Sequence, residues 1–164
     1  MSGVLQITRI HSSPDRVYKA ITTADGIHNW WTRDADLDAT VGGFGEFRFQ
    51  GGKMHARVAI AELEPQARVT WNAISGGGPF DEWKGATILF ELRAEGEDTV
   101  LSLAQRGFSK VDEGFALVTR GWGYFMQSLQ KYIETGKGSP APDGQHAGCQ
   151  CACMPADAPQ AALA

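Results

Sequence analysis

The first 148 residues contain no cysteine, and no part of the chain carries a long apolar run. Without cysteine, no disulfide framework holds the main part of the chain together, which is usual for a reducing compartment. A membrane helix needs about 20 consecutive apolar residues, and no segment reaches that length. The N-terminus also lacks the charged and apolar regions of a signal peptide. We therefore expect a cytoplasmic protein with no membrane partner.

Clustered positive charge is absent as well. The chain has 15 Lys and Arg against 19 Asp and Glu, for a net charge of -4, and its cations are scattered. Nucleic-acid surfaces need grouped cations that displace counterions, so we expect no nucleic-acid partner. The glycines do not form a phosphate loop or a nucleophile elbow, because no strand-to-helix context surrounds them. We expect no cofactor.

The last part of the chain differs in composition from the rest. From Gly138 onward it is rich in Pro, Gly and Ala, and such a segment cannot bury enough apolar surface to offset its ordering entropy. We predict a folded domain over residues 2–137 and a flexible tail over 138–164. The tail contains the ligand types of a zinc site, although Cys-x-Cys spacing is tighter than usual and reactive thiols are the preferred interpretation. These four tail residues are His146, Cys149, Cys151 and Cys153.

Strand and helix signals alternate over the first half of the chain. Residues 4–11 alternate between apolar and polar side chains, which predicts a strand. Ser13 and Pro14 are typical of a helix start, and a short second helix fits residues 25–30. Further strands, separated by turn residues, are predicted at 44–50, 53–64, 68–72, 86–92 and 99–106.

A long amphipathic helix is predicted at 111–135. Its apolar residues recur at steps of three and four, and Gly136 stands where a C-terminal cap belongs. Hairpins dominate the middle of the chain and no βαβ rhythm occurs. A one-sided antiparallel sheet needs a cover, and only this helix is long and apolar enough. We therefore predict an α+β fold in which a curved antiparallel sheet surrounds the C-terminal helix.

An ordered set of motifs over residues 4–138 resembles a known family. The set comprises residues 10–20, Trp30-Trp31, Gly42-Gly43-x-Gly-x-Phe47 and Gly121-Trp122-x-x-Phe125-x-x-Ser128-Leu129-x-x-Tyr132-x-Glu134-x-Gly136. It is similar to the bacterial AHSA1-like branch (activator of Hsp90 ATPase homologue) of the SRPBCC superfamily. The resemblance implies the helix-grip fold shared with START domains and Bet v 1. This superfamily includes lipid carriers, polyketide cyclases and co-chaperone domains, so fold alone leaves function open.

Nine residues are candidates for binding a flat or apolar ligand between the sheet and the last helix. Aromatic side chains supply a cavity wall, and Gln105 on an apolar strand face supplies a polar contact. The alternatives are plain core packing for the rings and a satisfied structural amide for Gln105. The nine candidates are Trp30, Trp31, Phe47, Phe49, Trp71, Trp83, Gln105, Trp122 and Phe125.

Three functions remain open from the sequence. A small-molecule binding protein, with an apolar partner in a hydrophobic cavity, is the first hypothesis. A cyclase- or hydrolase-like enzyme would need an acid–base residue in the same cavity, and no catalytic residue is assigned. Asp81, Glu82 and Lys84 surround Trp83, and the two carboxylates could act as acid or base at the cavity mouth, although this polar segment is expected to be solvated. Of the histidines, His28 is the one to test. A co-chaperone-like interaction module would need an exposed apolar patch. A homodimer through the sheet edge is a further alternative.

Overall fold

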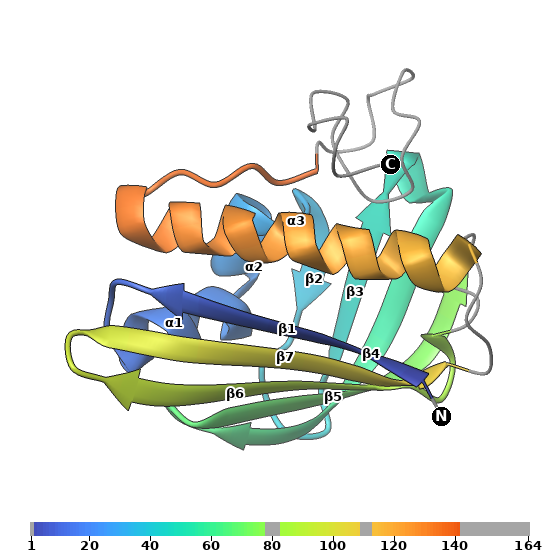
Figure 1. Ribbon diagram of the computed structural model, residues 1–164. Coiled ribbons are helices and arrows are strands. Elements are labelled where there is room, and N and C mark those ends of the chain that lie inside the picture. Colours follow the sequence, from blue (N-terminus) through green and yellow to red (C-terminus); the bar gives the residue numbers. More distant parts are fainter. Residues whose placement is uncertain (1, 78–82, 109–112, 142–164) are drawn as a thin grey trace.

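The computed structural model describes residues 2–77, 83–108 and 113–141 (Figure 1). Along the chain its elements are β1 (Ser2–Ile10), α1 (Pro14–Thr22), α2 (Ala24–Trp30), β2 (Asp34–Leu37), β3 (Phe44–Phe49), the 3₁₀ turn η1 (Gln50–Gly52), β4 (Met54–Glu64), β5 (Arg68–Gly77), β6 (Thr87–Glu95), β7 (Asp98–Phe108) and α3 (Glu113–Thr135).

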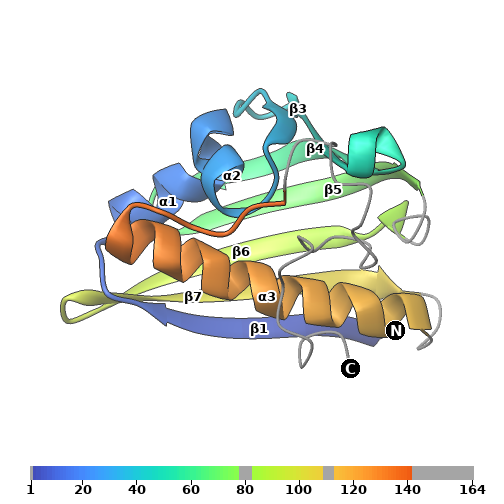
Figure 2. The same cartoon turned by 90° about the horizontal axis from the view of Figure 1, so that it is seen from above.

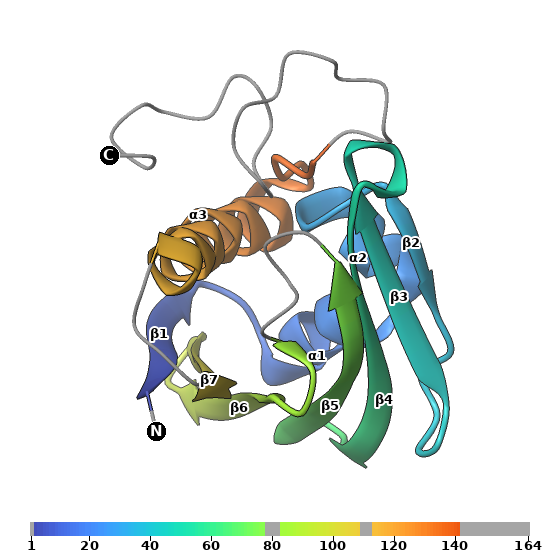
Figure 3. The same ribbon diagram turned by 90° about the vertical axis from the view of Figure 1, so that its right-hand side faces the viewer.

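The seven strands form one antiparallel sheet in the order β1-β7-β6-β5-β4-β3-β2. Strands β2 to β7 are neighbours in the order of the sequence, and β1 pairs with the edge of β7 that β6 leaves open. Seen end-on, the sheet curves so that β1 and β2 stand on opposite sides, with α3 lying across the opening between them (Figure 3). The predicted α+β helix-grip architecture is confirmed.

Strand β1 shows why the sheet has an inside and an outside. Val4 and Ile10 are buried on its inner face, whereas Leu5 and Ile7 are exposed on its outer face. This alternation follows from the period of two along a strand. The predicted strand is confirmed, and it contributes its apolar inner residues to the core.

The first short helix begins at the predicted capping residue, and the second begins at a cap that was not predicted. The Ser13 side chain accepts a hydrogen bond from the Arg16 backbone N–H, and Pro14 is the first residue of α1. Thr23 caps α2 in the same way by accepting from the Gly26 N–H at 3.0 Å. These bonds satisfy backbone donors that a helix start leaves open. Strand β2 was not predicted, because four residues are too few for a periodic signal.

Helix α3 runs along the inner side of the sheet, with α1 and α2 beside its C-terminal half (Figures 1 and 2). Its buried stripe contains Val118, Trp122, Phe125, Leu129 and Ile133. Gly136 follows its last turn with a φ of +87°, and its N–H donates to the Tyr132 carbonyl at 2.7 Å. The predicted stripe and glycine cap are confirmed, while the predicted start at 111 lies outside the described residues.

A serine hydroxyl ties α3 to α2 and to the segment after α3. The Ser128 Oγ donates to the Trp30 carbonyl at 2.7 Å and accepts from the Ser139 N–H at 2.7 Å. Further on, the Ala141 N–H donates to the Trp31 carbonyl at 2.8 Å. Contacts with the domain thus continue to residue 141, four residues beyond the predicted domain end at 137. The tail from 142 lies outside the described residues, and its flexibility stays a prediction.

The helices that the structure describes include none that is long and apolar enough to cross a membrane.

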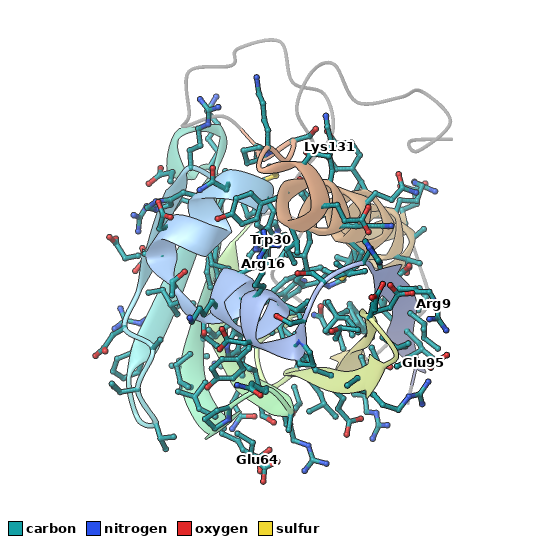
Figure 4. All side chains as sticks on the ribbon, turned by 90° about the vertical axis from the view of Figure 1, so that its left-hand side faces the viewer. Arg9, Arg16, Trp30, Glu64, Glu95 and Lys131 are labelled. Atoms are coloured by element: carbon teal, nitrogen blue, oxygen red, sulfur yellow. The ribbon has the colours of Figure 1, made fainter. Side chains whose placement is uncertain are left out.

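A charged cluster joins the end of β1 to the β6–β7 turn. His11 Nδ1 lies 2.7 Å from Asp98 Oδ1, and Arg9 Nη1 donates to Asp98 Oδ2 at 3.0 Å. Arg9 also pairs with Glu95, and Figure 4 shows these two side chains at the same outer edge. The hydrogen bond to the Asp98 carboxylate raises the pKa of His11, and the same bond lowers the pKa of Asp98. Protonated His11 is therefore the form that the fold favours.

We predict that His11 titrates above its unfolded pKa of about 6.5. Because the folded pKa is raised, the stabilisation from His11 is complete below the unfolded pKa and is lost as the pH rises through the folded value. NMR titration of the His11 ring is expected to show the raised pKa, and Asp98→Asn to return it toward 6.5. A titration of the unmodified protein at or below 6.5 would contradict this prediction.

Candidate functional site

Four tryptophans surround a fifth, Trp31. Its ring centroid lies 5.7 Å from that of Trp30, 6.2 Å from Trp71, 6.5 Å from Trp83 and 5.0 Å from Trp122. None of the five is more than 2% exposed. They are all the tryptophans of the chain. We call these five residues the indole cluster.

The indole cluster is assembled from separate parts of the chain. Trp30 and Trp31 end α2, Trp71 lies in β5, Trp83 precedes β6, and Trp122 lies in the middle of α3. The Trp30 indole N–H donates to the Ala20 carbonyl of α1 at 2.8 Å. In Figure 4, Trp30 lies inward, between the two short helices and α3. The fold therefore brings both helix units and the sheet to one point.

Phenylalanines extend the indole cluster along the inner face of the sheet. The Phe47 ring lies 4.4 Å from Trp31, Phe49 lies 5.8 Å from Trp31, and Phe125 lies 6.4 Å from Phe49. All eight aromatic candidates from the sequence are thus brought together. Their role in ligand binding stays a prediction.

Phe90 is a further aromatic ring beside the indole cluster, and it was not among the candidates from the sequence. Its ring packs edge-on against Trp71 at 4.9 Å and against Trp122 at 6.3 Å. The alternation of its strand indicates that Phe90 faces inward. That pattern does not distinguish a residue beside the indoles from any other core residue.

Gln105 is the one amide side chain among the buried residues that the structure describes, and it is 0% exposed. Its Oε1 accepts a hydrogen bond from the Trp122 indole N–H at 2.7 Å. Its Nε2 has no hydrogen-bond partner among the described residues. A buried donor without a partner costs about 1–3 kcal/mol. The amide is therefore satisfied at its oxygen and unsatisfied at its nitrogen.

Ionisable side chains stay outside the interior. In the described part of the chain, the buried polar residues are Ser12, Thr22, Thr32, Thr99, Gln105 and Ser128. None of these has a side chain suited to acid–base catalysis near neutral pH. Lys84 is exposed, while Asp81 and Glu82 lie outside the described residues. The described interior therefore lacks the group that the enzyme hypothesis requires.

The other sequence candidates lie away from the indole cluster or outside the described residues. His28 is half-buried, and its Nε2 lies 2.8 Å from the Ala35 carbonyl oxygen. The described ranges contain no group of three His, Cys, Asp or Glu side chains placed to hold a metal ion. The tail candidates His146, Cys149, Cys151 and Cys153 lie outside those ranges, so the zinc alternative stays untested.

A surface groove of about 560 Å³ lies between α1, the start of α2 and the end of α3. Arg16 crosses it and donates from Nη2 to the Ile133 carbonyl at 3.1 Å. Ala20, whose carbonyl accepts the Trp30 N–H, is part of the groove wall. The groove is therefore linked to the indole cluster through Ala20, and it contains none of the nine candidates. Its lining residues are Arg16, Lys19, Ala20, Thr23, Asp25, Tyr132, Ile133 and Gly136.

The curved sheet, the crossing helix and the aromatic interior define a helix-grip domain, and comparison with known proteins gives its family. The model of the family described as "Activator of Hsp90 ATPase homolog 1-like protein" matches residues 11–134. The chain therefore belongs to the AHSA1-like family, as the sequence motifs implied. No curated protein sequence is significantly similar to it.

Solved structures agree with this assignment. The Aha1 dimer from Colwellia psychrerythraea shares 31% identity with this chain at a TM-score of 0.74, over 84% of this chain and 100% of that one. DynU16, a putative protein in the dynemicin biosynthetic locus, shares 20% identity at 0.71, over 84% of this chain and 49% of that one. Protein MLL2253 from Mesorhizobium loti shares 20% identity at 0.68, over 81% and 97%. The last two likenesses show the fold alone.

We predict that Gln105 and Trp122 are energetically coupled. Trp122→Phe leaves the Gln105 oxygen without its donor, and Gln105→Leu leaves the indole N–H without its acceptor. Replacing both residues leaves neither an unpaired donor nor an unpaired acceptor. The loss of stability in the double variant should therefore be smaller than the summed losses of the two single variants, by about 1 kcal/mol or more. Urea denaturation of the four proteins measures this coupling. A control cycle between Gln105→Leu and Lys131→Ala, at an exposed position of α3, should be additive. If the Gln105 and Trp122 substitutions are also additive, the coupling is refuted.

Proposed function

We propose that this domain binds a flat, apolar small molecule against the indole cluster, between the sheet and α3. The observation that supports this proposal most directly is the near-parallel arrangement of the rings. Relative to Trp31, the interplanar angles are 10° for Trp30, 13° for Trp71 and 18° for Trp83. A flat molecule adds a further layer to such a set, because its faces meet indole faces in the offset stacking that aromatic pairs prefer.

The energetics favour a ligand of two or three fused rings. Burial of apolar surface contributes about 25 cal/mol per Å², so about 300 Å² contributes about 7 kcal/mol before association costs. The rings of the indole cluster already contact one another, so binding requires side chains to shift. We therefore expect dissociation constants in the micromolar range or weaker, and a ligand that enters slowly relative to diffusion.

We predict that fluorene, a flat apolar hydrocarbon, quenches the intrinsic fluorescence of the protein to saturation. Every tryptophan of the chain is in the indole cluster, so the signal reports on the proposed site alone. Trp31→Phe keeps a smaller ring and should weaken binding about fivefold or more. Val41→Thr, at an exposed position between β2 and β3, should leave binding unchanged. Absence of saturable quenching by fluorene in the folded, unmodified protein would refute the proposed function.

A second proposal concerns the outer face of β1, which we propose contacts a second copy of this chain. Leu5 and Ile7 are 63% and 65% exposed on this face. Across the sheet they pair with Ala104 and Ser102 of β7, so the strip between them is uncharged. An exposed apolar strip of this kind is typical of an interaction surface.

The choice of a second copy as the partner is supported by the relative from Colwellia psychrerythraea, which is described as a dimer. The co-chaperone hypothesis also requires an exposed apolar patch. The same strip would serve it, with a different protein as the partner instead of a second copy of this chain. Arg9, next along this face, is already paired with Glu95 and Asp98, so the strip itself carries no charge that would repel its copy.

We predict that the protein forms dimers that Ile7→Lys converts to monomers, because the substitution puts two like charges into the self-contact. Sedimentation equilibrium at several protein concentrations measures this change. Val41→Lys is the matched control, since Val41 is 66% exposed elsewhere on the surface. A monomer at every concentration, or a dimer that Ile7→Lys leaves intact, would exclude this interface.

A further inference from the structure

We infer that the molecule bound at the indole cluster carries a neutral hydrogen-bond acceptor oxygen, which Gln105 Nε2 binds. This inference rests on the proposed small-molecule function and adds a chemical class to it. The observation is the buried nitrogen of Gln105, which has no partner among the described residues while the oxygen of the same amide is bonded.

The orientation of the Gln105 amide is fixed by its partner. The Trp122 indole has an N–H and no acceptor, so it can bond only the amide oxygen. Turning the amide over would set two donors against each other. The NH₂ group therefore faces away from Trp122, and it offers two N–H donors to whatever lies beside the indole cluster.

The residues directly opposite Gln105 on the two neighbouring strands offer no side-chain acceptor. Val4 of β1 and Ile88 of β6 pair with Gln105 on either side, and both are apolar and buried. Leu103, two residues earlier on the same face of β7, is also buried and apolar. Because buried donors are nearly always bonded, this NH₂ group is where a bound molecule would gain a hydrogen bond.

The charge of that partner follows from what surrounds it. Within the described ranges, no Lys or Arg is among the buried residues, although the Nε atoms of Arg68 and Arg120 are buried. An anionic ligand would therefore lose its hydration without a fully buried counterion to replace it. A neutral carbonyl or ether oxygen avoids that cost. The expected ligand is therefore a flat ring system with one neutral acceptor oxygen. A fatty acid or another anion is not expected to bind here.

The test compares fluorene with fluorenone, two flat molecules that differ in one carbonyl oxygen. The unmodified protein is expected to bind fluorenone about three- to tenfold more tightly than fluorene, which is the effect of one net hydrogen bond. Gln105→Leu should abolish this preference, so that the variant binds the two molecules with equal affinity. Isothermal titration measures all four affinities, since ligand absorbance does not affect it.

The outcomes separate this inference from the function on which it rests. If neither molecule binds the unmodified protein, the proposed function fails and the inference fails with it. If both bind but with equal affinity, or if Gln105→Leu keeps the preference, only the inference is overturned, and the amide then serves the fold or holds an internal water. Circular dichroism checks that Gln105→Leu is folded; Gln105→Met, of closer shape, is the second variant. The comparison of two ligands on the unmodified protein requires no variant at all.

Discussion

The contact between Trp31 and Trp122 joins the two parts of the molecule that the sheet alone cannot hold together. The sheet is open between its edge strands β1 and β2, and only the helices bridge that opening. The ring of Trp122, in α3, lies 5.0 Å from the ring of Trp31, at the end of α2. The backbone repeats this connection, because Ser128 of α3 donates to the Trp30 carbonyl and Ala141 bonds the Trp31 carbonyl. The ring contact and these hydrogen bonds together hold α3 against the short helices and close the interior.

Much of the fold could be predicted from the sequence, because its longer elements have clear periods. Strand β1 and helix α3 show periods of two and of three to four, and the Ser13 cap is a local hydrogen bond. Strand β2 is too short to show a period. The sequence predicted a strand that ends at residue 72, but β5 continues to Gly77. Its last residues, Gly76 and Gly77, pair with β4, because the longer partner strand continues past the end of the apolar pattern.

The candidate site was predictable in its members and unpredictable in its contacts. Aromatic content and inward phase identified eight rings, yet periodicity relates residues only within one element. The meeting of α2, β5 and α3 at Trp31 depends on the tertiary fold. In the same way, Gln105 was recognised as a polar residue on an apolar face, but the sequence contains no signal that Trp122 takes its oxygen and leaves its nitrogen unbonded. The interior therefore combines closely packed rings with one amide that is bonded at its oxygen alone.

The pairing of β1 with β7 has a consequence for how this chain folds. Ile10 pairs with Thr99, so the first strand has its sheet partner only after 89 further residues have been added. Contacts between such distant residues close large loops, which slows folding. Until β7 emerges from the ribosome, the inner and outer apolar residues of β1 are both without neighbours in the sheet. The N-terminal strand is then the part of the nascent chain most exposed to aggregation and to chaperone binding.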